Sequence, residues 1–338
     1  MKVALITHAQ SAVPAWVISA LTEAGVTCVG DQCPNSGAIV RLAHDADVIW
    51  SYGTHHEHTP ASWREVIEEA LPDLKQCGAI LRSGSGTDNI PLEAATRHNI
   101  LVVNTPEATA EPVAEFAVGL MLAVGRQIVQ NAVALRSKDD ASKAPRPQRS
   151  LVGKMVGLVG FGHIAKLVAN RLSGFRPQLL AFDPAIPASD MQAHGVESVP
   201  FDQLLEQSDY ISLHCPLNDK THHLINESAL RKMQSSAILI NTARGEIVDE
   251  RALIEALDEG RIAGAGLDVT DPEPIDPGNP LLNMSNVVVT PHVAAFDEAI
   301  GQRLWQFSVE ALADLAQFRW PRSYVNHVQP RWPLRERD

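Results

Sequence analysis

The sequence predicts an α/β fold with two parallel β-sheets, each covered by helices. Short apolar runs alternate with amphipathic stretches of helical periodicity in both halves of the chain, a pattern typical of parallel sheets. The chain has 338 residues, which favours two domains over one. A glycine-rich loop at residues 157–165 lies near the middle of the chain, so another folded unit must precede it.

In the first half, the apolar runs are short and are bounded by charged residues or glycine, as expected of buried strands. Amphipathic stretches between them indicate crossover helices. We predict strands at residues 3–6, 26–29, 48–50, 79–81 and 101–103, and helices at 15–24, 62–70 and 92–98.

The second half has enough apolar runs for a complete doubly wound sheet. Asp249 is a predicted N-cap, and Gly260 is expected to end the helix that Asp249 starts. A further helix is expected near Asp297. The predicted strands are at residues 155–159, 179–182, 211–214, 238–241, 266–269 and 287–290.

Residues 112–125 are apolar on nearly every side at helical spacing, which predicts a helix buried between domains or between subunits. Its most apolar part, residues 116–124, is too short to span a bilayer of ~30 Å. The polar, proline-containing residues 136–150 are interpreted as an exposed loop.

Composition excludes several classes of function. The net charge of -12 argues against a nucleic-acid surface, which requires clustered Lys and Arg. The N-terminus lacks the apolar region of a signal peptide. The four cysteines form no CxxC pair or regular framework, which predicts reduced thiols in the cytoplasm, although Cys28 and Cys33 are close enough in sequence to pair.

The glycine loop has the features of a dinucleotide site. Gly160 allows the tight turn, Gly162 allows close approach of a pyrophosphate, and the small Ala165 lets helix and strand pack. The first N–H groups of the following helix, at His163 and Ile164, are expected to face the phosphates. The loop lacks the lysine of a P-loop, so the sequence does not suggest binding of a nucleoside triphosphate. The alternative is a glycine-rich turn that binds nothing.

Asp183 ends the next apolar run, where its carboxylate can accept hydrogen bonds from both ribose hydroxyls. A 2′-phosphate would be repelled by this carboxylate, and no Arg follows it closely. NAD is therefore predicted in preference to NADP.

Three polar residues that are suited to catalysis follow predicted strands in the same half: Arg244, Glu273 and His292. Because ligands of open α/β sheets bind at the carboxyl ends of the strands, these side chains are expected to converge. Taken alone, an Arg, Glu or His in a loop is usually solvated surface or a local cap.

In these motifs the chain resembles the NAD-dependent D-2-hydroxyacid dehydrogenase family, which includes dehydrogenases of D-lactate, D-glycerate (hydroxypyruvate/glyoxylate) and D-3-phosphoglycerate. The resemblance covers residues from about 80 to 292, and residues 324–326 resemble the family's tail. The matching stretches are Gly-Thr-Asp-Asn-Ile at 86–90, Asn-Thr-Pro at 104–106, Val-Ala-Glu at 113–115, the glycine loop with Asp183, His-Cys-Pro-Leu at 214–217, Asn-Thr-Ala-Arg-Gly at 241–245, Ala-Gly-Leu-Asp-Val at 265–269, Glu-Pro at 273–274 and Thr-Pro-His at 290–292.

The resemblance implies roles for these residues. His292 would be the general acid/base for reversible hydride transfer between NADH and a 2-oxoacid carbonyl, and Glu273 would hold its ring and favour the protonated form. Arg244 would bind the substrate carboxylate, together with backbone N–H groups near Ser85 and Gly86. The implied cofactor contacts also include Pro216, Thr221, Thr242, Ala243 and Asp268; Asp268 could equally be a strand-end cap.

The complete prediction is two Rossmann-like domains, one flavodoxin-like and one NAD-binding, with the site in a cleft between them. Residues 1–106 and 295–338 would form the substrate-binding domain, and residues 107–294 the NAD domain. The buried helix at 112–125 and the loop after it suggest a homodimer, as the resemblance to the family also implies, and the cysteine pattern suggests a cytoplasmic location. The alternatives are a non-enzymatic, NAD-sensing corepressor-like protein and a phosphite-type dehydrogenase.

Some residues depart from the family pattern or have more than one interpretation. Glu107 replaces the usual Gly, Thr109 stands where Asn is common, and Pro91 replaces an Asp. The cluster at residues 55–58 contains metal-capable side chains, but we interpret residues 52–56 as pocket lining or loop and predict no metal site.

Overall fold

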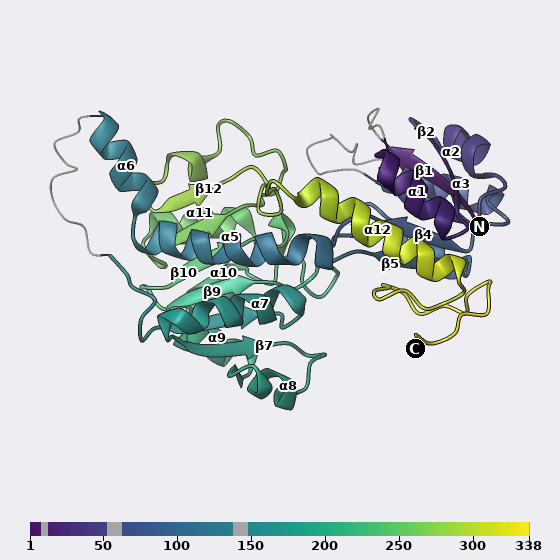
Figure 1. Cartoon of the computed structure of the whole chain (residues 1–338). Helices are drawn as coiled ribbons and strands as arrows, with labels where there is room; N and C mark the ends of the chain where they lie inside the picture. The colour runs from purple at the N-terminus through teal and green to yellow at the C-terminus, as the bar shows by residue number, and fades with distance from the viewer. Residues whose placement is uncertain (8–12, 53–62, 138–147, 338) are drawn as a thin grey trace. The chain divides into compact units, whose positions relative to one another are not determined.

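A computed structural model describes residues 1–7, 13–52, 63–137 and 148–337 (Figure 1). The chain divides into two compact units. Unit 1 comprises residues 1–109 and 297–338, and unit 2 comprises residues 110–296.

Unit 1 is built on a five-stranded parallel sheet with the order β2-β1-β3-β4-β5, which is the flavodoxin-like arrangement. All five strands that the apolar runs predict are confirmed. The strands of its central part are buried on both faces, which explains why they are almost continuously apolar. The strands are β1 (Lys2–Thr7), β2 (Thr27–Gln32), β3 (Val48–Ser51), β4 (Ala79–Arg82) and β5 (Leu101–Asn104).

Helices cover both faces of the unit 1 sheet. α1 (Ala15–Glu23) and α12 (Ile300–Ala316) pack on one face, and α2 (Ser36–Ala43), α3 (Trp63–Ala70) and α4 (Leu92–Arg97) pack on the other. The sequence prediction missed α2. This helix is the crossover that the parallel strands β2 and β3 require, and the Asn35 side chain caps it by accepting from the Ala38 N–H.

Unit 2 contains a seven-stranded parallel sheet with the order β12-β11-β10-β9-β6-β7-β8, which is a Rossmann order with one added edge strand. The six predicted strands are present, some shifted by one or two residues, and the exposed two-residue β8 was not predicted. The strands are β6 (Met155–Val159), β7 (Gln178–Phe182), β8 (Glu197–Ser198), β9 (Tyr210–Leu213), β10 (Ile238–Asn241), β11 (Gly264–Leu267) and β12 (Val287–Val289).

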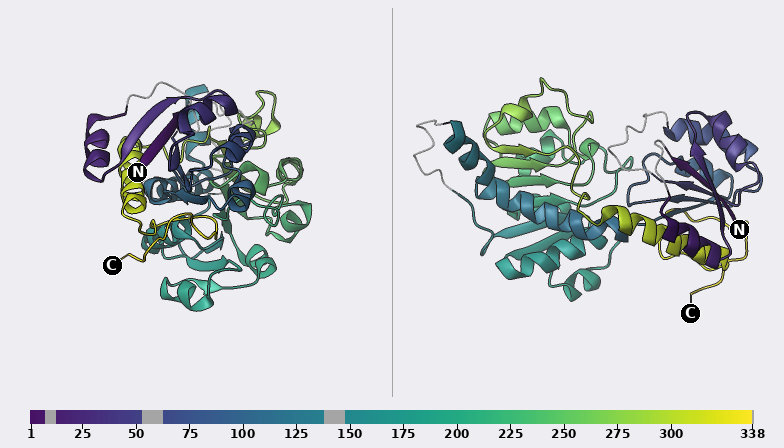
Figure 2. Two further views of the ribbon diagram at one scale, coloured as in Figure 1. Left: turned by 90° about the vertical axis from the view of Figure 1, so that its right-hand side faces the viewer. Right: turned by 45° about the horizontal axis from the view of Figure 1, so that its top comes forward.

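The unit 2 sheet is also covered on both faces (Figure 2). α5 (Glu107–Gly125) and α7 (His163–Leu172) pack on one face. On the other face lie α9 (Phe201–Gln207), α10 (Glu227–Lys232) and α11 (Glu250–Asp258). The predicted cap of α11 is confirmed, because the Asp249 side chain accepts from the Ala252 N–H and Gly260 follows the helix at φ 66°.

α5 begins earlier than the sequence predicts. Pro112 was expected to start this helix, yet it lies inside it. A proline leaves the carbonyl four residues earlier without its helical donor, and here Arg303 Nε donates to the Ala108 carbonyl at 2.9 Å. Among the described helices, α5 alone has the length and apolar composition to cross a membrane; 56% of its apolar window is buried inside the protein, as in a core helix.

Candidate active site

Three adjacent strands of unit 2 place the predicted catalytic residues. Arg244 follows β10, Glu273 follows β11 and His292 follows β12, and these strands are neighbours in the order β12-β11-β10. Because the strands are parallel, all three residues lie beyond the same edge of the sheet. This edge is where ligands of open α/β sheets bind.

The structure pairs the predicted acid and its carboxylate partner. His292 Nδ1 lies 2.6 Å from Glu273 Oε1. The His292 side chain is 16% exposed and that of Glu273 is 40% exposed. A carboxylate in this position accepts from Nδ1–H, fixes the ring orientation and makes Nε2 the nitrogen that would face a substrate.

His292 sits in a strained turn. Its φ of 53° is in the left-handed region, which costs a non-glycine residue about 1–2 kcal/mol. The backbone on either side is held by Asp268: the Asp268 carbonyl accepts from the His292 N–H at 2.7 Å, and the Asp268 carboxylate accepts from the N–H groups of Val293 at 2.9 Å and Ala294 at 2.7 Å.

The loop that carries Arg244 is shaped by Asn241, whose role the sequence reasoning missed. The Asn241 side chain accepts from the Ala243 N–H at 3.0 Å and donates to the Arg244 carbonyl at 2.8 Å. Arg244 Nη1 in turn donates to the Ala243 carbonyl at 2.6 Å. The side-chain amide therefore fixes the backbone from which the guanidinium extends.

Gly245 brings the Arg244 loop against the loop that leads to Glu273. A Cβ added at Gly245 would lie 2.1 Å from the Thr270 carbonyl oxygen and 2.2 Å from its carbon. Only glycine permits this approach. Two of the three predicted catalytic residues thus extend from backbone segments in direct contact.

The predicted dinucleotide loop has the geometry that a pyrophosphate requires. Gly160 has φ 87°, and a Cβ there would lie 2.7 Å from the Cys215 nitrogen, whereas the space beside Gly162 is open. His163 and Ile164 begin α7, and no described residue accepts from their N–H groups. Such N–H groups at a helix start are suited to binding phosphate.

Asp183 follows β7 and is fixed by two backbone donors. Its Oδ2 accepts from the Phe161 N–H at 2.8 Å, and its Oδ1 accepts from the Ala185 N–H at 2.8 Å. Each oxygen keeps a lone pair for a ribose hydroxyl. Asp183 therefore also holds the glycine loop, a contact that was not predicted.

Further polar groups lie beyond β9 and β10. Thr221 Oγ1 donates to the Pro216 carbonyl at 2.6 Å, so these two predicted residues lie together. His214 Nε2 and Thr242 Oγ1 are buried and have no hydrogen-bond partner among the described residues. Burial lowers the pKa of His214 to about 4. Orphaned polar atoms at the strand ends fit a polar cofactor.

The predicted substrate-binding residues Ser85 and Gly86 follow β4 in unit 1. Within the described parts of the chain, no acceptor is found for their backbone N–H groups. The preceding Gly84 has φ 108° and donates its N–H to Thr105 Oγ1 at 2.8 Å. Two neighbouring N–H groups without acceptors suit a carboxylate.

Aromatic side chains cluster at the end of β3 in the same unit. Tyr52 stacks on Trp305 of α12 with ring centroids 3.8 Å apart, and Trp50 meets Trp305 edge-on at 5.3 Å. Tyr52 begins the stretch at residues 52–56 that we interpret from the sequence as pocket lining or loop. The cluster at residues 55–58 and most of the predicted loop at 136–150 lie outside the described residues.

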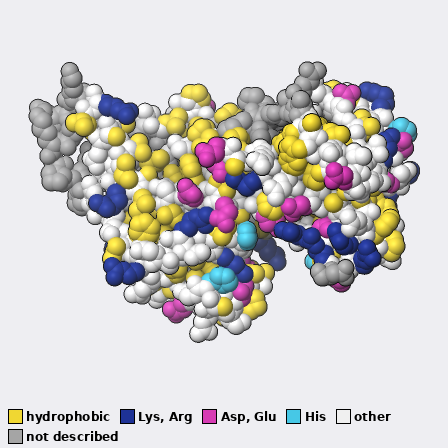
Figure 3. All heavy atoms as spheres, in the orientation of Figure 1, with side chains coloured by type: hydrophobic (Ala, Val, Ile, Leu, Met, Phe, Trp, Pro, Cys, Tyr) yellow, Lys and Arg dark blue, Asp and Glu magenta, His cyan; other side chains and the backbone are white. Residues whose placement is uncertain are grey.

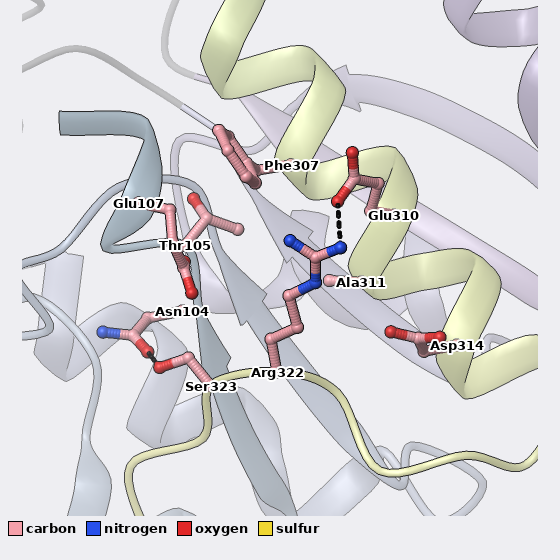
Figure 4. A pocket seen from close by; sticks show the side chains of 9 residues that line it. All are labelled: Asn104, Thr105, Glu107, Phe307, Glu310, Ala311, Asp314, Arg322 and Ser323. Atoms are coloured by element: carbon pink, nitrogen blue, oxygen red, sulfur yellow. Dashed lines mark hydrogen bonds and ion pairs between the residues drawn. The ribbon is translucent and has the colours of Figure 1, made fainter. Parts of the chain in front are cut away.

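A pocket of unit 1 beside α12 contains none of the predicted site residues (Figure 4). Arg322 Nη2 reaches to 3.6 Å from a Glu310 carboxylate oxygen. The described residues hold no group of three or more metal-capable side chains. The four cysteines are all described, and none is in a disulfide. The pocket is lined by Asn104, Thr105, Glu107, Phe307, Glu310, Ala311, Asp314, Arg322 and Ser323.

Comparison with known proteins gives consistent results. A family profile described as the NAD binding domain of D-isomer specific 2-hydroxyacid dehydrogenase matches residues 118–294. A glyoxylate reductase from Korarchaeum cryptofilum is 40% identical over 298 residues, which cover 87% of this chain and 86% of that protein. A hydroxypyruvate reductase from Thermotoga maritima is 44% identical over 231 residues, covering 68% and 73%.

A solved structure agrees with these sequence matches. It is the NAD-complexed D-isomer specific 2-hydroxyacid dehydrogenase from Lactobacillus delbrueckii ssp. bulgaricus, which is similar to this chain with a TM-score of 0.74 at 28% identity and covers 96% of this chain and 100% of that one. The profile match spans the glycine loop and the three strand ends described above. This chain therefore belongs to the D-isomer specific 2-hydroxyacid dehydrogenase family and is an NAD-dependent oxidoreductase.

Proposed function

We propose that this chain interconverts a short 2-oxoacid and its D-2-hydroxyacid, with His292, Glu273 and Arg244 as the catalytic residues. The observation that carries the proposal is the 2.6 Å contact between His292 and Glu273 beyond the strand ends, with the Arg244 loop packed against the loop before Glu273. An acid, an oriented ring and a fixed guanidinium are what carbonyl reduction requires.

Each residue has a distinct task in this proposal. His292 gives a proton from Nε2 to the carbonyl oxygen during reduction and takes it back during oxidation. Glu273 holds Nδ1–H and stabilises the imidazolium by its charge. Arg244 grips the substrate carboxylate with its planar fork. Bound NADH supplies the hydride that reaches the carbonyl carbon.

The remaining polar groups would bind and orient. The N–H groups of Ser85 and Gly86 would donate to the substrate carboxylate. The start of α7 would bind the pyrophosphate, and Asp183 the adenosine ribose. The cofactor site and the catalytic side chains Arg244 and His292 would thus belong to unit 2, and Ser85 and Gly86 of unit 1 would add donors for the substrate. The names of the relatives from K. cryptofilum and T. maritima suggest glyoxylate and hydroxypyruvate as first substrates to test.

A homodimer in the cytoplasm is also part of the proposal. Hydrophobic side chains lie on the surface over α6 (Ile128–Ser137) in Figure 3. The most exposed large apolar side chains of this helix include Val133 at 56% and Leu135 at 77%. Such a face favours a second copy of the chain as its partner, and four unpaired cysteines fit a reducing compartment. Leu135→Glu should shift the mass measured by light scattering from dimer to monomer. Ile18→Glu, which replaces another exposed apolar residue on α1, should leave the mass unchanged.

The test is NADH oxidation with a panel of 2-oxoacids, followed by His292→Ala. Wild type should reduce at least one of glyoxylate, hydroxypyruvate and pyruvate, and the variant should be at least ~100-fold slower in kcat. His44→Ala, at a histidine whose side chain is 66% exposed, serves as the matched control. Near-wild-type turnover by His292→Ala would refute the catalytic assignment, and phosphite oxidation without 2-oxoacid reduction would refute the substrate class.

A further inference from the structure

The carboxylate of Asp268 is buried, and both of its oxygens accept hydrogen bonds from nearby residues. Asp268 follows β11 and is 1% exposed. Its Oδ1 accepts from Thr290 Oγ1 at 2.6 Å and from the Val293 N–H at 2.9 Å. Its Oδ2 accepts from the Ala294 N–H at 2.7 Å. Every one of these donors belongs to the segment that surrounds His292.

These bonds bracket the strained residue. Thr290 precedes His292 by two positions, and Val293 and Ala294 follow it directly. The Asp268 carbonyl also accepts from the His292 N–H. A left-handed non-glycine residue persists only where its surroundings fix the backbone on both sides. Here a single aspartate supplies that constraint from a different strand.

The electrostatics agree with this arrangement. Burial raises the pKa of the Asp268 carboxyl, and the donated hydrogen bonds oppose that rise. Desolvation of a buried carboxylate offsets much of the stability that its hydrogen bonds contribute. A gain in folding stability is therefore a poor explanation for Asp268. The four contacts with residues 290–294 are better explained by control of the backbone conformation.

We propose that Asp268 is a positioning residue that acts through His292: its carboxylate holds the turn at 290–294 so that the imidazole meets Glu273 and the substrate. This inference rests on the proposed catalytic role of His292. The sequence left two roles open for Asp268, a cofactor contact and a strand-end cap, and positioning of His292 is distinct from both.

The experiment compares Asp268→Asn, Thr290→Val and Thr290→Ser with wild type and His292→Ala. In Asp268→Asn the amide cannot accept at both ends, so one N–H group of the turn loses its acceptor or faces another donor. We expect kcat to fall ~100-fold, close to the loss of a general acid. Thr290→Val removes one bond to the carboxylate and should lower kcat about 10-fold, and Thr290→Ser should restore it.

Two further readouts separate positioning from cofactor binding and from general destabilisation. The Kd for NADH, measured by fluorescence titration, should stay within about 3-fold of wild type in Asp268→Asn. The double variant Asp268→Asn/His292→Ala should be no slower than His292→Ala alone, because both changes disable the same group.

Each outcome decides a separate point. If His292→Ala turns over normally, the proposed function fails. If His292→Ala is slow but Asp268→Asn and Thr290→Val match wild type, only the positioning role is overturned. The positioning role is also overturned if Asp268→Asn binds NADH with a tenfold higher Kd and the losses in kcat of the two single variants add in the double variant. If Asp268→Asn does not fold, the Thr290→Val and Thr290→Ser pair decides.

Discussion

The contact between the Arg244 loop and the loop before Glu273 can be tested by one added methyl group. In Gly245→Ala, the new Cβ would lie 2.1 Å from the Thr270 carbonyl oxygen and 2.8 Å from the Asp271 nitrogen. Both neighbours are backbone atoms, so no side chain can rotate away. The two loops must therefore separate.

The size of the effect follows from that distance. Relief of the contact requires a separation of about 1 Å, and overpacking of this kind costs about 1–3 kcal/mol of stability. A displacement of about 1 Å of a catalytic group costs on the order of 100-fold in rate. Because Arg244 and Glu273 extend from the two loops, we expect kcat/KM to fall about 100-fold in a folded variant with a lower Tm.

The assay is NADH oxidation with the best 2-oxoacid, together with circular dichroism and thermal unfolding. Gly174→Ala is the matched control, since the same methyl group there meets nothing within 4 Å and the residue is exposed. The control should keep wild-type kcat/KM. A folded Gly245→Ala variant with unchanged kcat/KM would refute the claim that this approach positions the catalytic loops.

Further predictions concern the carboxylate fork, the ribose site and a buried histidine. Arg244→Lys should raise the KM for 2-oxoacids while the Kd for NADH stays constant, because an ammonium cannot form a bidentate pair; unchanged oxoacid kinetics would contradict this. Asp183→Ala should weaken NADH binding and narrow the NAD/NADP preference, since Asp183 also holds the Phe161 N–H; an unaltered preference would show that another group reads the ribose. Burial lowers the pKa of His214 to about 4 in the folded protein, so the unfolded chain binds the proton more readily. The free energy of unfolding should therefore decrease by up to about 3 kcal/mol as the pH is lowered from 6.5 to 4. His214→Asn should lose less unfolding free energy than wild type between pH 7 and 4.5 in denaturant titrations, and parallel curves would count against it.

The strands and the residue types of the site were predictable because their signals are local. Strands buried on both faces of a parallel sheet appear as short apolar runs, and the glycine loop with Asp183 spans one βαβ unit. α2 was missed because only Ile39 and Ala43 are buried in it, which gives a weak periodic pattern. The predicted start of α5 was wrong because Arg303, which is distant in sequence, donates to the Ala108 carbonyl in place of the N–H that Pro112 lacks.

The supports of the site could not be predicted, because they depend on residues distant in sequence. Asp268 and Thr290 belong to different strand ends, and no pattern in the sequence indicates their 2.6 Å hydrogen bond. The approach of Gly245 to Thr270 is likewise a property of packed backbones. The glycine was visible in the Asn-Thr-Ala-Arg-Gly motif, but the loop it contacts was not.

The most direct test of the catalytic arrangement is a crystal structure of this chain with NADH and oxamate, a non-reactive 2-oxoacid analogue. We predict that oxamate lies against the nicotinamide, with His292 Nε2 and the Arg244 guanidinium each at roughly 3 Å from its oxygens. Oxamate bound there without contact to either side chain would contradict the proposal.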